Sequence, residues 1–163
     1  MEQSKEVKLL WTGGWDSTFR LLQLIDNKEV FVKPYYIIDT ARASTTVEIK
    51  TLSKLKKLIK QYLPDAYQYL GAFNFFSIHE IEENEEISQS YHVLKSRSYL
   101  GGQYDWLARF IAQNGISGLE LSVHRDDTTY PFLKDNVVLS NITNLGEIYE
   151  LNLDKYPKEG LYV

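Results

Sequence analysis

The 163-residue chain contains no cysteine, no long hydrophobic run and no excess of basic residues. Without cysteine it cannot form a disulfide, bind a metal through a thiolate or use a cysteine nucleophile. No stretch of about 18 apolar residues is present to span a bilayer, and the first eight residues, MEQSKEVK, lack the apolar core of a secretory signal. We therefore expect a cytoplasmic protein with no membrane partner.

The lack of an excess of basic residues limits which binding partners the chain is expected to have. The net charge is −4, whereas broad nucleic-acid binding requires a basic face, so a nucleic-acid partner is not expected. A small anionic ligand in a local pocket remains compatible with this charge. The hydrophobic fraction of 44% and the length predict one globular domain over residues 1–163, irregular from about residue 132.

Hydrophobic patterning predicts alternating strands and helices in the first half. Residues 7–11 form a short apolar run typical of a buried strand, and residues 16–26 have helical spacing. Pro34 cannot donate a ladder hydrogen bond, so we expect the next strand at residues 35–38. An apolar stripe predicts a helix over residues 45–63. The order β-α-β-α favours a three-layer α/β/α fold with a mainly parallel sheet.

The remaining elements are less regular. Thr45 and Glu48 have the spacing of a capping box at the start of the second helix. In order, we then expect a strand at 75–81, solvated acidic surface from Glu80 to Glu86, a helix between Gly102 and Gly115, a strand at 119–123, and short strands at 137–139 and 148–151.

The stretch LLWTGGWDST, residues 9–18, lies between the first strand and the first helix. In open parallel sheets, ligands bind at the carboxyl ends of strands. The N-terminus of a helix there offers free N–H groups and the positive end of a dipole, which suits phosphate. Gly13 and Gly14 let the backbone approach that phosphate without a side-chain clash. The stretch therefore predicts a phosphate-binding loop.

Side chains of the same stretch add polar groups. Ser17 and Thr18 supply hydroxyl donors. Asp16 would be repelled by bare phosphate, so it fits either beside a divalent cation or as a helix cap. A simple Gly-Gly turn followed by an Asp or Ser N-cap stays open as the alternative. Of the two flanking tryptophans, we expect Trp11 in the core and Trp15 covering the loop.

This loop matches neither the Walker nor the dinucleotide-binding pattern. It resembles the S-G-G-x-D-S loop of the ATP-pyrophosphatase (PP-loop) superfamily, with Thr12 in place of the first serine. The resemblance implies an adenine nucleotide alpha-hydrolase-like (HUP-type) fold and an enzyme that cleaves ATP to AMP and pyrophosphate while adenylating a small-molecule substrate. It assigns pyrophosphate and Mg²⁺ to Thr12, Gly13, Gly14, Asp16, Ser17 and Thr18, with Asp16 on the metal and Asp16 and Ser17 in catalysis.

Later residues are similar to 7-cyano-7-deazaguanine synthases. In that family an arginine precedes a glutamate after the second strand, as Arg42 precedes Glu48 here, and residues 99–103 and 126–131 resemble its later blocks. The resemblance implies an ATP-dependent synthase or ligase with a nitrogen nucleophile. That family carries a zinc-binding cysteine cluster, which this chain lacks. A sulfur-transfer or sulfonucleotide relative and a non-catalytic adenine-nucleotide-binding module therefore stay open, as does a homo-oligomer.

Further candidates follow the second strand. The fold resemblance suggests that the backbone of residues 36–38, including Tyr36 and Ile38, pairs with adenine. Asp39 ends this strand and either reaches ribose or metal or forms a turn.

Arginines are candidates for clamping phosphate with a bidentate fork. Arg97 and Arg125 flank predicted loops at the ligand edge, so we assign Arg97 to catalysis and Arg125 to ATP, whereas Arg42 and Arg109 are weaker candidates. Asp126 and Asp127 fit a metal or substrate site, and equally an Asp-Asp turn.

Overall fold

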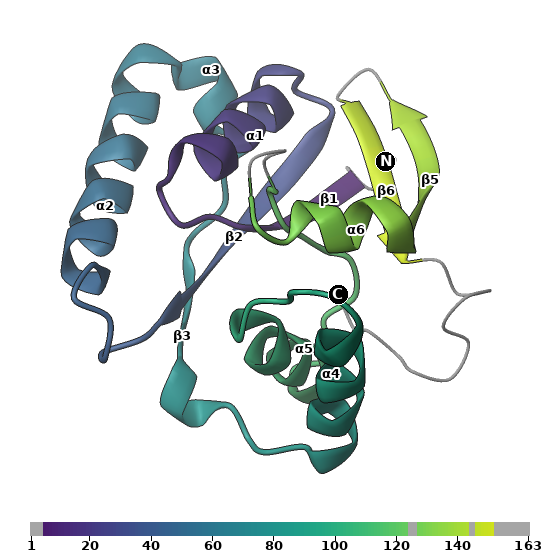
Figure 1. Ribbon diagram of the computed structural model, residues 1–163. Coiled ribbons are helices and arrows are strands. Elements are labelled where there is room, and N and C mark those ends of the chain that lie inside the picture. The colour runs from purple at the N-terminus through teal and green to yellow at the C-terminus, as the bar shows by residue number, and fades with distance from the viewer. Residues whose placement is uncertain (1–4, 124–126, 144–145, 152–163) are drawn as a thin grey trace. The chain divides into compact units, whose positions relative to one another are not determined.

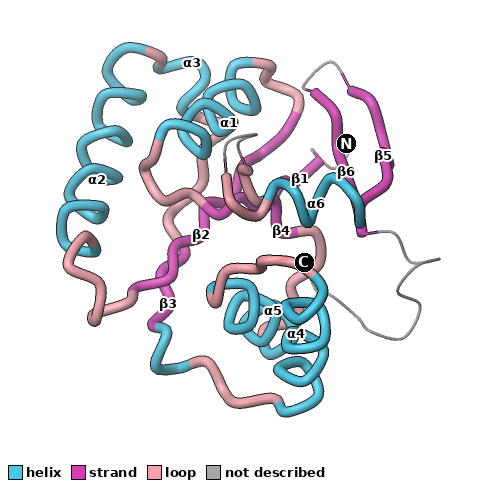
Figure 2. The backbone as a smooth tube through the Cα atoms, viewed as in Figure 1, coloured by secondary structure: helices cyan, strands magenta, loops and turns pink. Residues whose placement is uncertain are grey.

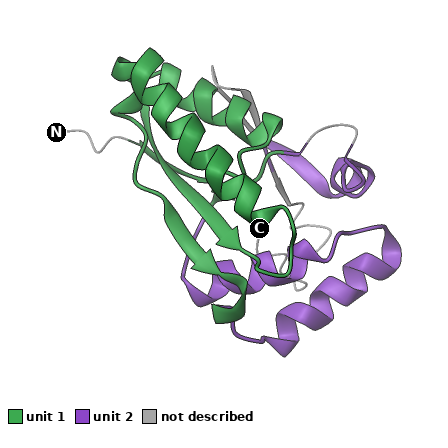
Figure 3. Ribbon diagram, turned by 90° about the vertical axis from the view of Figure 1, so that its left-hand side faces the viewer, with its two compact units in different colours: residues 1–80, 118–122 green, residues 81–117, 123–163 purple. Residues whose placement is uncertain are grey.

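The computed structural model describes residues 5–123, 127–143 and 146–151. The chain forms two compact units (Figure 3). Unit 1 comprises residues 1–80 and 118–122, and unit 2 comprises residues 81–117 and 123–163.

Unit 1 contains a four-stranded sheet in which every pair is parallel (Figure 1). Its strands are β1 (Lys5–Leu10), β2 (Val30–Ile38), β3 (Asn74–Ser77) and β4 (Leu119–Glu120). They lie in the order β3-β2-β1-β4. The predicted parallel sheet is confirmed, although β4 has only two residues and β3 ends earlier than expected, where Ile78–Glu80 forms a 3-10 turn.

Helices connect and flank this sheet (Figure 2). α1 (Trp15–Asp26) connects β1 to β2. Along the chain, α2 (Thr45–Tyr62) and the short α3 (Pro64–Tyr67) follow β2 and precede β3. Both long helices were predicted, because each has apolar residues at helical spacing. The buried core of unit 1 includes Leu9, Leu21, Leu24, Ile25, Val32, Leu52, Ile59 and Leu70. The described chain is thus a mixed α/β fold.

Proline does not interrupt the second strand, so the predicted start at Tyr35 is wrong. The carbonyl of Val32 accepts a hydrogen bond from the N–H of Gly71 at 2.9 Å, and backbone groups alternate along a strand, so the nitrogen of Pro34 faces the same side. The ladder with β3 begins only at Asn74, opposite Tyr35. The missing donor therefore falls on the β3 side, where Pro34 has no ladder partner. The carbonyl of Pro34 accepts a hydrogen bond from the side-chain amide of Asn74 at 3.2 Å.

The predicted capping box is also wrong. Ser44 is the N-cap of α2, and it makes no side-chain cap hydrogen bond. The hydroxyl of Thr45 instead donates to the carbonyl of Asp39, and the carboxylate of Glu48 is held by Tyr36. Both side chains have partners outside the helix, which local spacing cannot reveal.

The described part of unit 2 contains three helices and a strand pair. α4 (Glu85–Arg97) and α5 (Gln103–Gln113) come first, followed by α6 (Tyr130–Asn136) and the antiparallel strands β5 (Val137–Thr143) and β6 (Gly146–Leu151). The sequence predicted α5 but missed α4, and it predicted only short strands in a part expected to be irregular. The acidic residues from Glu80 to Glu86 are exposed, as predicted. Within the described ranges, no helix is both long and apolar enough to cross a membrane.

Candidate functional site

The loop between β1 and α1 turns at a glycine in the left-handed backbone region. Gly13 has φ +79°, a conformation that side chains rarely adopt. A Cβ atom there would lie 3.3 Å from Cδ2 of Leu52 on α2, so glycine also allows the loop to lie close to that helix. Gly14 is the N-cap of α1, with extended backbone angles and no side-chain cap. The alternative of an Asp or Ser cap is therefore wrong.

The start of α1 presents unpaired backbone donors. The first helical bond runs from the N–H of Thr18 to the carbonyl of Gly14 at 3.0 Å. The N–H groups of Trp15, Asp16 and Ser17 have no hydrogen-bond partner among the residues that the structure describes. Such groups, together with the helix dipole, attract anions.

The loop hydroxyls serve first to hold the loop together. Ser17 is buried, and its Oγ lies 3.4 Å from the N–H of Thr12, 3.3 Å from the Thr12 hydroxyl and 3.4 Å from the carbonyl of Gly14. The hydroxyl of Thr18 accepts a hydrogen bond from the indole N–H of Trp11 at 3.0 Å. Trp11 is fully buried, which confirms its predicted core position.

Asp16 is exposed at the second position of α1. Within the described residues its carboxylate makes no hydrogen bond or ion pair, and no three His, Asp or Glu residues gather there into a metal site. Mg²⁺ is usually held by one or two carboxylates together with substrate phosphates, so a lone carboxylate fits this ion only with a phosphate present. Trp15 is 90% exposed and does not cover the loop.

One backbone edge is open at the end of β2. The N–H of Trp11 donates to the carbonyl of Tyr35 at 2.9 Å, so the backbone groups of Tyr35 face β1. Because backbone groups alternate along a strand, the N–H and carbonyl groups of Tyr36 and Ile38 face β3, with which these residues pair. The N–H and carbonyl groups of Ile37 face the β1 side, at a point beyond the last residue of β1. Within the range 36–38 that the sequence suggested, Ile37 is thus the residue whose backbone groups have no strand partner on the β1 side.

Asp39 forms a turn directly after β2. Its Oδ1 accepts a hydrogen bond from the N–H of Ala41 at 2.9 Å, and its carbonyl accepts one from the N–H of Arg42 at 3.2 Å. The turn role left open by the sequence is thus present. A contact with ribose or metal stays a prediction.

Behind this turn, three side chains form a hydrogen-bonded network. Tyr36 donates its hydroxyl to Oε2 of Glu48 at 2.8 Å, and Arg42 donates to Oε1 of Glu48 at 3.0 Å. Burial, then the hydrogen bond to Glu48, raises the pKa of Tyr36 to about 12. The structure therefore brings together the arginine and the glutamate that suggested the synthase family, and pairs them with each other.

The other candidate residues belong to unit 2. Arg97 ends α4 in unit 2 and is exposed. Arg109, also in unit 2, pairs with Asp105 at 3.1 Å. Asp127 accepts a hydrogen bond from the N–H of Thr129 at 2.7 Å, as a turn residue does. Arg125 and Asp126 lie outside the described residues.

The strand order places the loop at a particular point of the sheet. The chain adds β2 and β3 on one side of β1 and β4 on the other, so its direction reverses beside β1. In open α/β sheets, nucleotides bind at the carboxyl ends of strands at such a reversal. The loop follows the carboxyl end of β1, and Ile37 lies near that of β2.

No family model, curated protein or solved structure matches this chain. The candidate site therefore rests on the residues and geometry of the chain itself.

Proposed function

We propose that unit 1 binds ATP with Mg²⁺. The observation that carries this proposal is the set of unpaired N–H groups at the start of α1, with the exposed carboxylate of Asp16 beside them, at the strand-order reversal. The N–H groups would hold the phosphates, Asp16 would hold Mg²⁺ together with phosphate oxygens, and the backbone of Ile37 would pair with adenine.

We further propose that the bound ATP is cleaved between its α- and β-phosphates, as the PP-loop resemblance implies within a HUP-type fold. An oxygen of a small-molecule substrate attacks the α-phosphorus, and the bond to the bridging oxygen breaks. Pyrophosphate leaves, and a nitrogen nucleophile then displaces AMP. Transfer at phosphorus depends mainly on positioning and on neutralising charge. The amides of Asp16 and Ser17 would hold the departing oxygens while Mg²⁺ neutralises their charge.

The variant Asp16→Asn tests this proposal. It removes the carboxylate charge and keeps the size of an exposed side chain. We expect AMP and pyrophosphate release from ATP, Mg²⁺ and a panel of carboxylate substrates with ammonia to fall about 100-fold, the scale of losing one charge-stabilising group. The melting temperature should hardly change, since a charge in the first turn contributes only about 0.3–1 kcal/mol to helix stability.

The matched control is Asp26→Asn, because Asp26 is an exposed carboxylate at the other end of α1. It should leave pyrophosphate release at the wild-type rate. Wild-type release from folded Asp16→Asn would refute the metal role.

A second candidate is adenine-nucleotide binding without turnover. Both arginines of unit 1 already form ion pairs, Arg20 with Glu120 at 3.0 Å and Arg42 with Glu48 at 3.0 Å. Unit 1 therefore offers no uncommitted guanidinium to a transition state. Magnesium-dependent binding of ATP that yields neither AMP nor pyrophosphate with any substrate of the panel would favour this candidate.

A further inference from the structure

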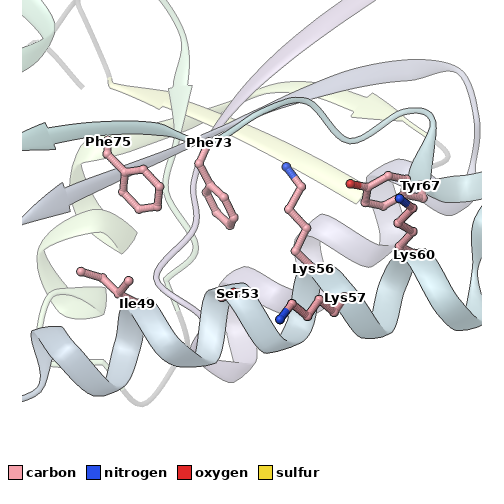
Figure 4. Close-up of a pocket in the computed structure, with 8 residues that line it drawn as sticks. All are labelled: Ile49, Ser53, Lys56, Lys57, Lys60, Tyr67, Phe73 and Phe75. Atoms are coloured by element: carbon pink, nitrogen blue, oxygen red, sulfur yellow. The ribbon is translucent and has the colours of Figure 1, made fainter.

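A pocket lies in unit 1 between α2 and the rings of Phe73 and Phe75, lined by residues that the proposed ATP site does not use. Its volume is about 520 Å³, within the range of small-molecule sites. Figure 4 shows the rings of Phe73 and Phe75 facing α2, with Ile49 below Phe75. Ser53 is the smallest lining side chain, and it leaves space between the helix and these rings.

The pocket is lined by both apolar and positively charged side chains. Ile49, Phe73 and Phe75 give one end apolar walls, and the Phe75 side chain is 45% exposed although it is large and apolar. Lys56, Lys57 and Lys60 also line the pocket, and no Asp or Glu does. Figure 4 shows the ammonium group of Lys56 reaching between Phe73 and Tyr67. The lining is thus complementary to a ligand that has both an aromatic ring and a negative charge.

The lysines have no anion of their own. Among the described residues, no ion pair is formed by Lys56, Lys57 or Lys60. Lys56 is fixed in the wall, since its Nζ donates to the carbonyl of Gly71 at 2.9 Å and lies 4.9 Å from the centroid of Phe73. Burial lowers the pKa of Lys56, so a bound anion would relieve a desolvated charge.

The aromatic end is rigid. Phe73 stacks on Trp11 with ring centroids 5.1 Å apart, and on Phe75 at the same distance. Phe75 in turn meets Tyr36 edge-on. A ligand ring would therefore enter a preformed aromatic wall, which reduces the conformational entropy lost on binding.

We infer that this pocket binds a small aromatic anion, with its ring against Phe73 and Phe75 and its phosphate or carboxylate among Lys56, Lys57 and Lys60. The volume suits one small molecule and not a nucleic-acid strand.

The test uses 1-naphthyl phosphate as the probe, titrated into the full chain and followed by amide NMR. The matched probes are 1-naphthol, which has the ring without the charge, and inorganic phosphate, which has the charge without the ring. We expect saturable binding of naphthyl phosphate with shifts at Ser53 and Lys57, and at least tenfold weaker binding of either matched probe.

Variants locate the site. Lys57→Gln combined with Lys60→Gln should weaken naphthyl phosphate binding about tenfold, the scale of two partly exposed ion pairs. Lys50→Gln combined with Lys54→Gln removes the same charge from exposed positions of the same helix that do not line the pocket, and should leave affinity unchanged. Ser53→Phe fills the space and should also weaken binding at least tenfold.

Several results would overturn the inference. These are an absence of saturable naphthyl phosphate binding, equal loss of affinity in the two double-lysine variants, or binding that single-stranded oligonucleotides outcompete at equal concentration. Asp16→Asn separates this site from the proposed ATP site. If that variant weakens the naphthyl phosphate complex while the variant at Lys57 and Lys60 does not, the probe occupies the β1–α1 loop and the pocket is not its site.

Discussion

At the scale of single residues, Gly13 sets the shape of the β1–α1 loop. Its φ of +79° is a conformation that residues with a Cβ atom rarely adopt. An added Cβ atom would also lie only 3.3 Å from Leu52. We predict that Gly13→Ala lowers the free energy of unfolding by about 1–3 kcal/mol, since left-handed backbone alone costs about 1–2 kcal/mol in a residue with a Cβ. Urea unfolding followed by circular dichroism measures the change.

The adjacent glycine provides the control for that variant. Gly14 has φ −71° and ψ 169° at the N-cap of α1, an extended conformation in which serine is a preferred cap. Gly14→Ser should therefore leave the free energy of unfolding within about 0.5 kcal/mol of wild type, or raise it. Equal stability of Gly13→Ala and Gly14→Ser would contradict the strain assigned to Gly13.

Tyr36 makes stability depend on alkaline pH. Its pKa is raised from 10.0 to about 12 by burial and by its hydrogen bond to Glu48, so the folded state retains the phenol proton that the unfolded chain releases. This contribution is fully present below pH 10 and is lost as pH rises toward 12. Unfolding free energies at pH 9–12 should fall more steeply for wild type than for Tyr36→Phe. Identical slopes would contradict the raised pKa.

At the scale of elements, few residues of α2 are buried. Leu52 is fully buried beside the loop, whereas Leu58 on the same helix is 36% exposed. We predict that Leu52→Ala lowers the free energy of unfolding by about 2–5 kcal/mol, since it leaves a cavity. Leu58→Ala should cost less than about 1 kcal/mol. Denaturant unfolding of both variants measures the difference, and equal losses would mean that α2 is not held through Leu52.

The same elements show how far the sequence predicts the structure. β1, α1, α2 and the loop between β1 and α1 follow from hydrophobic spacing and paired glycines, which are local signals. The start of β2 was missed because the tolerance of Pro34 depends on where the ladder with β3 begins. Glu48 was misassigned because its partners, Tyr36 and Arg42, lie outside its helix.

Among candidate site residues, the sequence located the loop but not the roles of its side chains. From position along the chain alone, Ser17 and Thr18 are predicted to be ligand-binding hydroxyls. Position along the chain does not show that their hydroxyls are engaged within the loop, or that Ile37 is the residue of β2 whose backbone faces the β1 side. These assignments require the strand register, which depends on contacts between distant segments.

At the scale of the whole molecule, the net charge of −4 conceals local differences. Exposed glutamates gather between residues 80 and 86, while five lysines, Lys50, Lys54, Lys56, Lys57 and Lys60, lie on α2. Overall charge therefore argued against a broad basic face without excluding the lysine-lined pocket. Unit 1 carries both candidate sites, the β1–α1 loop for ATP and the pocket beside α2 for an aromatic anion.

Titration of ATP with Mg²⁺ into isotope-labelled protein, followed by amide NMR, tests the central claim most directly. We predict saturable shifts at residues 13–18 and at Ile37, with affinity that falls when Mg²⁺ is omitted and in Asp16→Asn. A folded sample whose amides at residues 13–18 and Ile37 stay unchanged at saturating ATP, or whose shifts are confined to the lining of the α2 pocket, would contradict the proposed ATP site.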